Sequence, residues 1–110
     1  MRVGVVGTGY LGRLHARILC EIPEADVVGF VETNDAVAAE VSQSLGLRRL
    51  DSVTALARQA DCAIVATPTT THFQVARQLI EAGLDVLIEK PITPTVEEGQ
   101  RLVDFATARN

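Results

Sequence analysis

The stretch that decides the fold is VGVVGTGYLG, Val3–Gly12, at the start of the chain. Its valines are typical of a buried strand, and the residues after it have the apolar spacing of a helix. Between them, GTGYLG matches G-x-G-x-x-G, whose glycines permit a tight turn, close approach of a pyrophosphate, and close packing of helix on strand. Glycine-rich turns also occur for packing reasons alone. The candidate cofactor-binding residues of this turn are Gly7, Thr8, Gly9, Tyr10, Leu11 and Gly12.

An acidic residue at a suitable distance favours the binding interpretation. Glu32 lies about twenty residues beyond Gly12, at the end of a second apolar strand, where a carboxylate can accept hydrogen bonds from ribose hydroxyls. It would also repel the 2′-phosphate of NADP, because two like charges about 4 Å apart cost about 4 kcal/mol at an effective dielectric of about 20. No Arg or Lys follows closely, since Thr33, Asn34 and Asp35 come next. We therefore expect NAD to be preferred over NADP; the alternative is a merely exposed acid at a helix start.

The remaining sequence alternates apolar strands with helices. The predicted strands are Arg2–Gly7, Ala25–Glu32, Leu47–Leu50, Cys62–Ala66 and Asp85–Glu89. The predicted helices are Leu11–Ile22, Asp35–Leu45, Ser52–Gln59, His72–Ala82 and Val96–Ala108. Strands that are apolar on both faces need a parallel sheet covered by helices on both sides. The expected class is therefore α/β, a Rossmann-type doubly wound parallel sheet with five strands in the order 3-2-1-4-5, lacking the sixth strand of that fold.

Composition narrows the possible functions. The 110 residues suit one domain, with 47% apolar, 22% charged and 4% aromatic residues. A net charge of −4 and the lack of a basic cluster argue against nucleic-acid binding, and the short apolar runs argue against a membrane span. The start of the chain shows no signal-peptide pattern, so we expect a cytoplasmic protein. Cys20 and Cys62 lack the spacing of a metal or redox site, and no metal site is predicted.

Two further segments fall at the carboxyl ends of strands. ATPTTTH, Ala66–His72, follows the fourth strand beside the first, where the strand order reverses and ligands bind. Thr67 and Pro68 can present backbone to a cofactor there. His72 is a candidate as well, although a residue in the first turn of a helix often serves only as a cap. His15 is interpreted as a packed or half-buried imidazole rather than a catalyst.

The tripeptide Glu89-Lys90-Pro91 follows the fifth strand at the same edge of the sheet. From there Lys90 can reach the nicotinamide side of the crevice. Its ammonium group can donate to a substrate hydroxyl and stabilise the negative charge that develops as a hydride leaves the carbon. Composition alone would favour a solvated lysine. Glu89 and Lys90 join the candidate cofactor-binding residues, and Lys90 is the candidate catalytic residue.

The chain resembles the glucose–fructose oxidoreductase, inositol dehydrogenase and rhizopine-catabolism family (Gfo/Idh/MocA). The resemblance lies in VGVVGTGYLGRLHARIL, VVGFVETN and ATPTTTHFQVARQLIEAGLDVLIEKPIT. It implies that Lys90 lies near the nicotinamide and the substrate hydroxyl, that Pro91 follows a cis peptide bond, and that a sugar, polyol or nucleotide-sugar carbon is oxidised or reduced. The family also has histidines at the places of His15 and His72. Many members have asparagine where this chain has Thr69.

Family members also carry a second α+β domain, which covers the crevice and supplies an acid–base His, Asp or Tyr. We interpret residues 1–110 as the NAD-binding domain of an NAD-dependent oxidoreductase, inactive alone and with a sugar-like substrate bound partly by that second domain. The alternative is a stand-alone NAD-binding or interaction module without catalysis, in which Lys90 would have no evident purpose. Without a sixth strand, the fifth strand is an exposed edge, so we expect self-association through this edge or through an exchanged last helix. The alternative is that the helix Val96–Ala108 folds across the edge and shields it.

Overall fold

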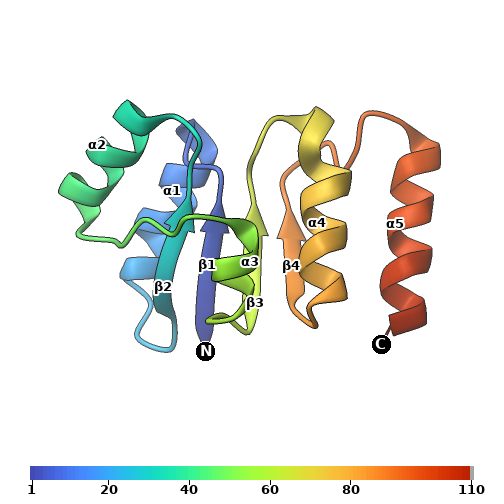
Figure 1. The fold of residues 1–110 in the computed structure, drawn as a ribbon, viewed down its shortest axis with the longest axis horizontal. Helices are drawn as coiled ribbons and strands as arrows, with labels where there is room; N and C mark the ends of the chain where they lie inside the picture. The colour runs from blue at the N-terminus through green and yellow to red at the C-terminus, as the bar shows by residue number, and fades with distance from the viewer. Residues whose placement is uncertain (110) are drawn as a thin grey trace.

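The computed structural model describes residues 1–109 and shows one parallel sheet with helices on both sides (Figure 1). The strands, in the spatial order β2-β1-β3-β4, are β1 (Arg2–Val6), β2 (Asp26–Val31), β3 (Cys62–Val65) and β4 (Asp85–Ile88). The helices are α1 (Tyr10–Cys20), α2 (Asp35–Leu45), α3 (Val53–Ala57), α4 (His72–Glu81) and α5 (Val96–Arg109), with a short 3₁₀ turn η1 (Thr69–Thr71) before α4. All strand pairs are parallel, so the carboxyl ends of the strands meet at one edge.

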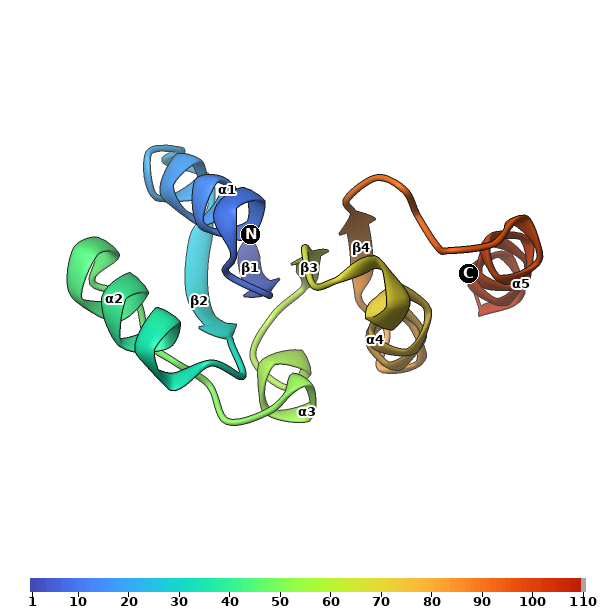
Figure 2. The same ribbon diagram turned by 90° about the horizontal axis from the view of Figure 1, so that it is seen from above.

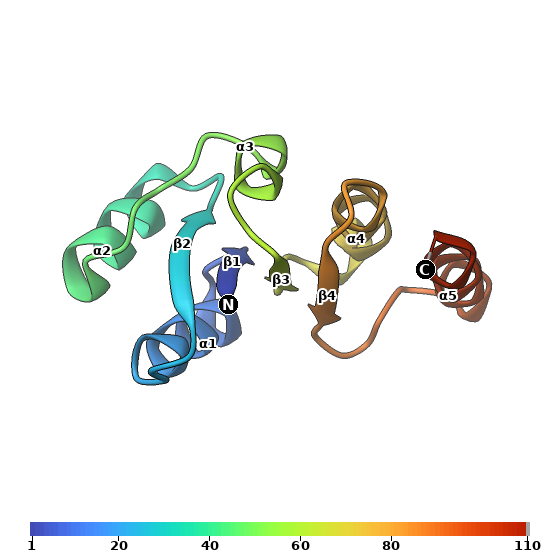
Figure 3. The ribbon, with the colours of Figure 1, turned by 90° about the horizontal axis from the view of Figure 1, so that it is seen from below.

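The two faces of the sheet carry separate apolar cores, as the apolar strands predicted. Consecutive strand residues point to opposite faces. Val5 and Phe30 pack with α1 and α2 on one face, and Val6 and Val65 pack with α3 and α4 on the other. Figures 2 and 3 show this division, with α5 beyond β4 and next to α4. The doubly wound α/β class is confirmed.

The prediction of five strands is wrong, because the segment Leu47–Leu50 does not form a strand. It lies beside β2, where the third strand was expected, but makes a single bridge between Phe30 and Arg49. The Phe30 N–H donates to the Arg48 carbonyl over 3.0 Å, and the Leu50 N–H donates to the Phe30 carbonyl over 2.7 Å. Only a few residues separate the end of α2 from the start of α3, so the chain turns away before a ladder can form.

Most helix boundaries agree with the prediction to within two residues, and local side chains explain several of them. Ser52 caps α3, and its hydroxyl accepts the Ala55 N–H over 3.0 Å. The hydroxyl of Thr95 accepts the Glu98 N–H over 3.2 Å, which is one half of a capping box at the start of α5. A cap that the sequence interpretation missed starts α2, where the Asn34 side chain accepts from the backbone of the first turn.

The apolar side chains that predict the helix α1 are only partly buried. This helix approaches the sheet through the small residues Gly12 and Ala16, which are its buried positions. Leu11 and Ile18 each remain 45% exposed. Hydrophobic spacing therefore located the helix correctly, but the close approach of its small residues decided which side meets the sheet.

β4 is an edge strand, and α5 covers it only in part. Leu102 of α5 packs with Ala76 and Ile80 of α4, and this cluster touches Val86 and Ile88 on one face of β4. On the opposite face Leu87 is 54% exposed. Within residues 1–109, no helix has both the length and the apolarity required to span a membrane.

Candidate cofactor-binding site

The glycine turn joins β1 to α1 at the carboxyl edge of the sheet, and each glycine is there for a different steric reason. Gly7 has a φ of 89°, a conformation that side chains disfavour, and a Cβ here would lie 2.7 Å from the Thr67 nitrogen. A Cβ on Gly12 would lie 1.8 Å from the Gly7 carbonyl oxygen. A Cβ on Gly9 would meet no described atom within 4 Å. The backbone at Gly9 is therefore open to a ligand. Gly7 and Gly12 instead allow backbone segments to pack more closely than any side chain would permit.

The start of α1 has the features of an anion site. Its N-cap residue is Gly9, and within residues 1–109 no side chain caps it and no acid occupies its first turn. The Arg13 N–H donates to the Gly9 carbonyl over 2.9 Å. The N–H groups before Arg13 therefore face outward at the positive end of the helix dipole, where a phosphate can accept from them. Tyr10, 85% exposed, and Leu11 flank this opening.

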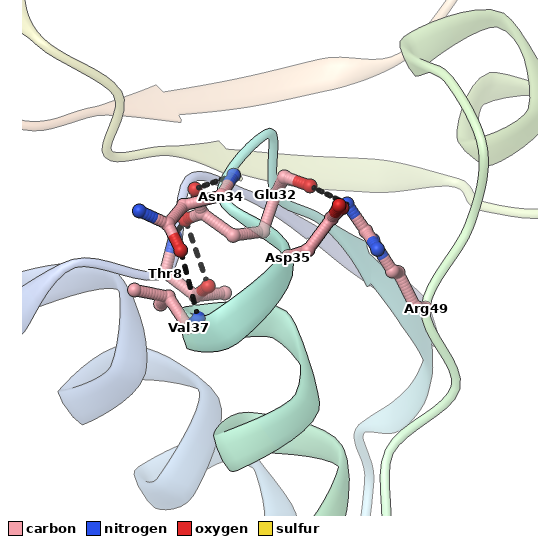
Figure 4. A network of polar contacts seen from close by, with 6 residues as sticks. All are labelled: Thr8, Glu32, Asn34, Asp35, Val37 and Arg49. Atoms are coloured by element: carbon pink, nitrogen blue, oxygen red, sulfur yellow. Dashed lines mark hydrogen bonds and ion pairs between the residues drawn. The ribbon is translucent and has the colours of Figure 1, made fainter.

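The Glu32 carboxylate accepts three hydrogen bonds, two from the glycine turn and one from its own segment (Figure 4). The backbone N–H and the hydroxyl of Thr8 donate to its Oε1 over 2.8 and 2.9 Å, and the Asn34 N–H donates to Oε2 over 2.9 Å. Thr8 is fully buried, so its side chain serves Glu32 rather than solvent. Burial raises the pKa of Glu32, but the N–H groups of Asn34 and Thr8 and the Thr8 hydroxyl outweigh burial, so the net pKa is lowered.

A cation that the sequence interpretation missed lies beside Glu32. The Arg49 Nη2 donates to the main-chain carbonyl of Glu32 over 2.7 Å and to Asp35 Oδ1 over 2.9 Å (Figure 4). The expectation that no Arg or Lys lies near Glu32 is therefore wrong. That expectation considered only the residues immediately after Glu32, whereas Arg49 returns to β2 from a later segment. The predicted pairing of Leu47–Leu50 with the second strand was the signal that could have placed it there.

The loop after β3 packs against the glycine turn and is braced from within. The Thr71 hydroxyl lies 2.7 Å from both the Thr67 hydroxyl and the Pro68 carbonyl. His72 lies beneath this loop and is 1% exposed. Its Nε2 lies 2.8 Å from the Thr67 carbonyl, and its Nδ1 lies 3.0 Å from the carbonyl of Pro91. The ring thus bridges two loops at the carboxyl edge and turns no face to solvent.

The third component of the site is the loop after β4. The Glu89 N–H continues the sheet by donating to the Val65 carbonyl over 3.0 Å. The carboxylate of Glu89 is paired with His15 Nε2 from α1, and this hydrogen bond lowers the pKa of Glu89. His15 is therefore a bridge between α1 and this loop, a role that its sequence context did not reveal. Lys90 is exposed, and the Lys90–Pro91 peptide bond is cis, as the family resemblance implied.

The structure brings the predicted residues to one edge of the sheet, with the exception of His72, which lies below that edge. The Glu32 carboxylate is hydrogen-bonded to Thr8 of the glycine turn, and the Glu89 carboxylate is hydrogen-bonded to His15 of α1, the helix that follows this turn. A free helix N-terminus, an open glycine backbone and a carboxylate at the end of the neighbouring strand form the dinucleotide-binding arrangement of α/β proteins. The fold and the site together define a dinucleotide-binding domain.

Comparison with known proteins identifies the family. Residues 1–110 match the model of the Gfo/Idh/MocA oxidoreductase family, described as an NAD-binding Rossmann fold, and the chain belongs to this family. It is 42% identical over 110 residues to UDP-N-acetylglucosamine 3-dehydrogenase of Acidithiobacillus ferrooxidans, covering 100% of this chain and 34% of the relative. The solved structure of that relative superposes with a TM-score of 0.93, over 99% of this chain and 35% of the other.

Two further relatives agree with this assignment. Inositol 2-dehydrogenase 3 of Saccharopolyspora erythraea is 34% identical over 112 residues, covering 99% of this chain and 33% of the relative. The structure of GenD2 from gentamicin A biosynthesis, in complex with NAD, is 31% identical with a TM-score of 0.92, over 99% of this chain and 32% of the other. The chain thus spans about a third of the length of the relatives it matches.

Proposed function

We propose that this chain binds NAD along the carboxyl edge of its sheet as the cofactor domain of a dehydrogenase. The dehydrogenase transfers a hydride to or from a hydroxyl-bearing carbon of a sugar, polyol or nucleotide sugar. The observation that carries the proposal is the convergence of three separate chain segments on this edge. The Thr8–Glu32 and His15–Glu89 contacts join these segments, and they would keep the proposed phosphate and ribose sites and the Lys90 loop in one arrangement.

The residues present fit the cofactor. The free N–H groups at the start of α1 would hold the diphosphate, and the open backbone at Gly9 leaves room for it. Glu32 Oε1 accepts two hydrogen bonds from Thr8, whereas Oε2 accepts one from the Asn34 N–H and keeps a second acceptor site for a ribose hydroxyl. Thr67 and Pro68 would face the cofactor through their backbone. Bound NAD would supply the hydride acceptor or donor.

We assign Lys90 the catalytic role and Glu89 the role of orienting its loop. The carboxylate of Glu89 is committed to His15, so it holds the loop against α1. Lys90 is exposed and can donate a hydrogen bond to the hydroxyl of a substrate, stabilising charge that develops on that oxygen. His72, which we predicted as a cofactor contact, is better suited to positioning, because its ring spans the carbonyls of Thr67 and Pro91.

The substrate class follows from the relatives. Those named above include a dehydrogenase of UDP-N-acetylglucosamine and a dehydrogenase of inositol. Both names are consistent with hydride transfer at a ring carbon that carries a hydroxyl group. Since the chain spans about a third of these relatives, substrate contacts beyond Lys90 would come from a further domain. Residues 1–110 alone would then bind NAD without turnover.

Calorimetric titration of residues 1–110 with NAD and with NADP tests the cofactor proposal. We expect NAD to bind more tightly than NADP, because Glu32 is ionised at neutral pH and would face the 2′ position of the adenosine ribose. Glu32→Gln keeps the shape of the side chain and removes its charge, so it should narrow the difference between the affinities for NAD and NADP. No binding of either cofactor would refute the proposed function. Equal affinities in the wild type would refute the preference for NAD.

A further inference from the structure

Arg49 is a cation at the proposed ribose site for which NAD binding has no use. Its Nη2 contacts the Glu32 carbonyl over 2.7 Å and the Asp35 carboxylate over 2.9 Å, so it lies at the same strand end as the Glu32 side chain. A guanidinium group has five N–H donors, and these two contacts share one nitrogen. Arg49 therefore keeps donors for a further acceptor.

The ion pair that holds Arg49 is easily exchanged. The Asp35 side chain is 91% exposed and the Arg49 side chain is 38% exposed. Exposed ion pairs between one carboxylate and one cation are weak, because water screens them and both side chains lose freedom. A phosphate is a stronger partner for arginine, since it matches the planar guanidinium with two parallel hydrogen bonds and can carry two charges.

We propose that Arg49 is a specificity-determining residue that can accept the 2′-phosphate of NADP. In this arrangement Glu32 repels the phosphate, Arg49 attracts it, and Asp35 masks Arg49 when no phosphate is present. The preference for NAD is thus the balance of an acid and a base, and the domain retains a measurable affinity for NADP. This inference rests on the proposed cofactor function and adds a second residue to its selectivity.

The test measures dissociation constants of NADH and NADPH by their fluorescence in the wild type and in Glu32→Ser, Asp35→Asn and Arg49→Gln variants. The readout is the ratio of NADPH affinity to NADH affinity. Glu32→Ser should raise this ratio at least tenfold by removing the repulsion. Adding Arg49→Gln to that variant should lower the ratio again by about tenfold, the value of one hydrogen bond to a charged group. Asp35→Asn should raise the ratio several-fold by freeing Arg49.

Arg48→Gln is the matched control. Arg48 is an exposed neighbour on the same segment, and its side chain makes no hydrogen bond or ion pair to the part of the chain that the structure describes. It changes the net charge equally, so an effect of overall charge would appear in both variants. We expect the affinity ratio to respond to Arg49→Gln at least five times more strongly than to Arg48→Gln.

Three results would overturn the inference. The first is an affinity ratio in the Glu32→Ser variant that does not change when Arg49 is replaced. The second is an equal loss of NADH and NADPH affinity in Arg49→Gln together with a lower unfolding temperature, because Arg49 would then only brace the start of α2. The third is an absence of NADH binding in the wild type, which removes the proposed function as well. The first two results leave NADH binding by the wild type intact, so failure of this inference and failure of the proposed function are distinguishable.

Discussion

Replacing two glycines of the same turn by alanine should affect different properties. Gly12→Ala should lower stability, whereas Gly9→Ala should lower the affinity for the cofactor. In Gly12→Ala the new methyl carbon would lie 1.8 Å from the Gly7 carbonyl oxygen and 2.8 Å from its carbon, so backbone must move. Overpacking of this kind costs about 3 kcal/mol, and the better helix propensity of alanine returns about 1 kcal/mol. The net loss in the free energy of unfolding is about 2 kcal/mol, or roughly 8 °C in the melting temperature of a domain of this size.

Gly9→Ala should leave stability unchanged and weaken cofactor binding. The new methyl group would meet no described atom within 4 Å, and the backbone at Gly9, with φ −65° and ψ −161°, is extended. The smaller entropy of the unfolded chain favours alanine by about 0.5 kcal/mol, and the preference for glycine over alanine at an N-cap offsets a similar amount. The methyl group would, however, occupy the space through which a diphosphate approaches the backbone, so NAD affinity should fall at least tenfold.

Urea unfolding followed by circular dichroism measures the first effect, and NADH fluorescence titration measures the second. The wild type and both variants are compared at one pH and one salt concentration. Normal NADH affinity in Gly9→Ala would refute the placement of the diphosphate at this turn. Wild-type stability in Gly12→Ala would show that the contact between α1 and the turn is looser than the structure indicates.

Three other perturbations test separate parts of the structure. Because the folded-state pKa of Glu32 lies below its ordinary value of 4.5, its ionised form stabilises the fold above that pH, and this contribution is lost on acidification. The free energy of unfolding, measured between about pH 5 and 3, should therefore fall less steeply with decreasing pH in Glu32→Gln than in the wild type. Equal slopes in the two proteins would contradict this. In a longer protein that joins this domain to a substrate domain, Lys90→Ala should lower kcat about a hundredfold with little change in NADH affinity, and a reverse pattern in steady-state kinetics and titration would argue against catalysis. The exposed edge at β4 should make residues 1–110 self-associate, and Leu87→Lys should reduce this in light scattering; a monomer at every concentration would refute it.

Local sequence signals were sufficient to predict the helices, four of the five expected strands, and the edge of the sheet that carries the candidate site. The glycine pattern and the apolar runs depend on neighbouring residues, because periodicity and backbone sterics act over a few positions. Parallel strands then bring Gly9, Glu32 and Lys90 to one edge, since every crossover returns the chain in the same direction. The class of fold and most candidate residues followed from these rules. The number of strands did not, because the extent of a ladder depends on how long two segments stay side by side.

Contacts between distant segments were decided only by the tertiary structure. His15 and Glu89 are 74 positions apart, and Arg49 is 17 positions from Glu32, yet both pairs are in hydrogen-bond contact. No spacing rule links such residues, because the contact depends on the angle at which a helix or loop returns to the sheet. The same holds for α1, where the close fit of Gly12 and Ala16 leaves Leu11 half exposed. Sequence alone determined where the polar groups of the site lie along the chain, and packing of the whole chain determined which of them are paired.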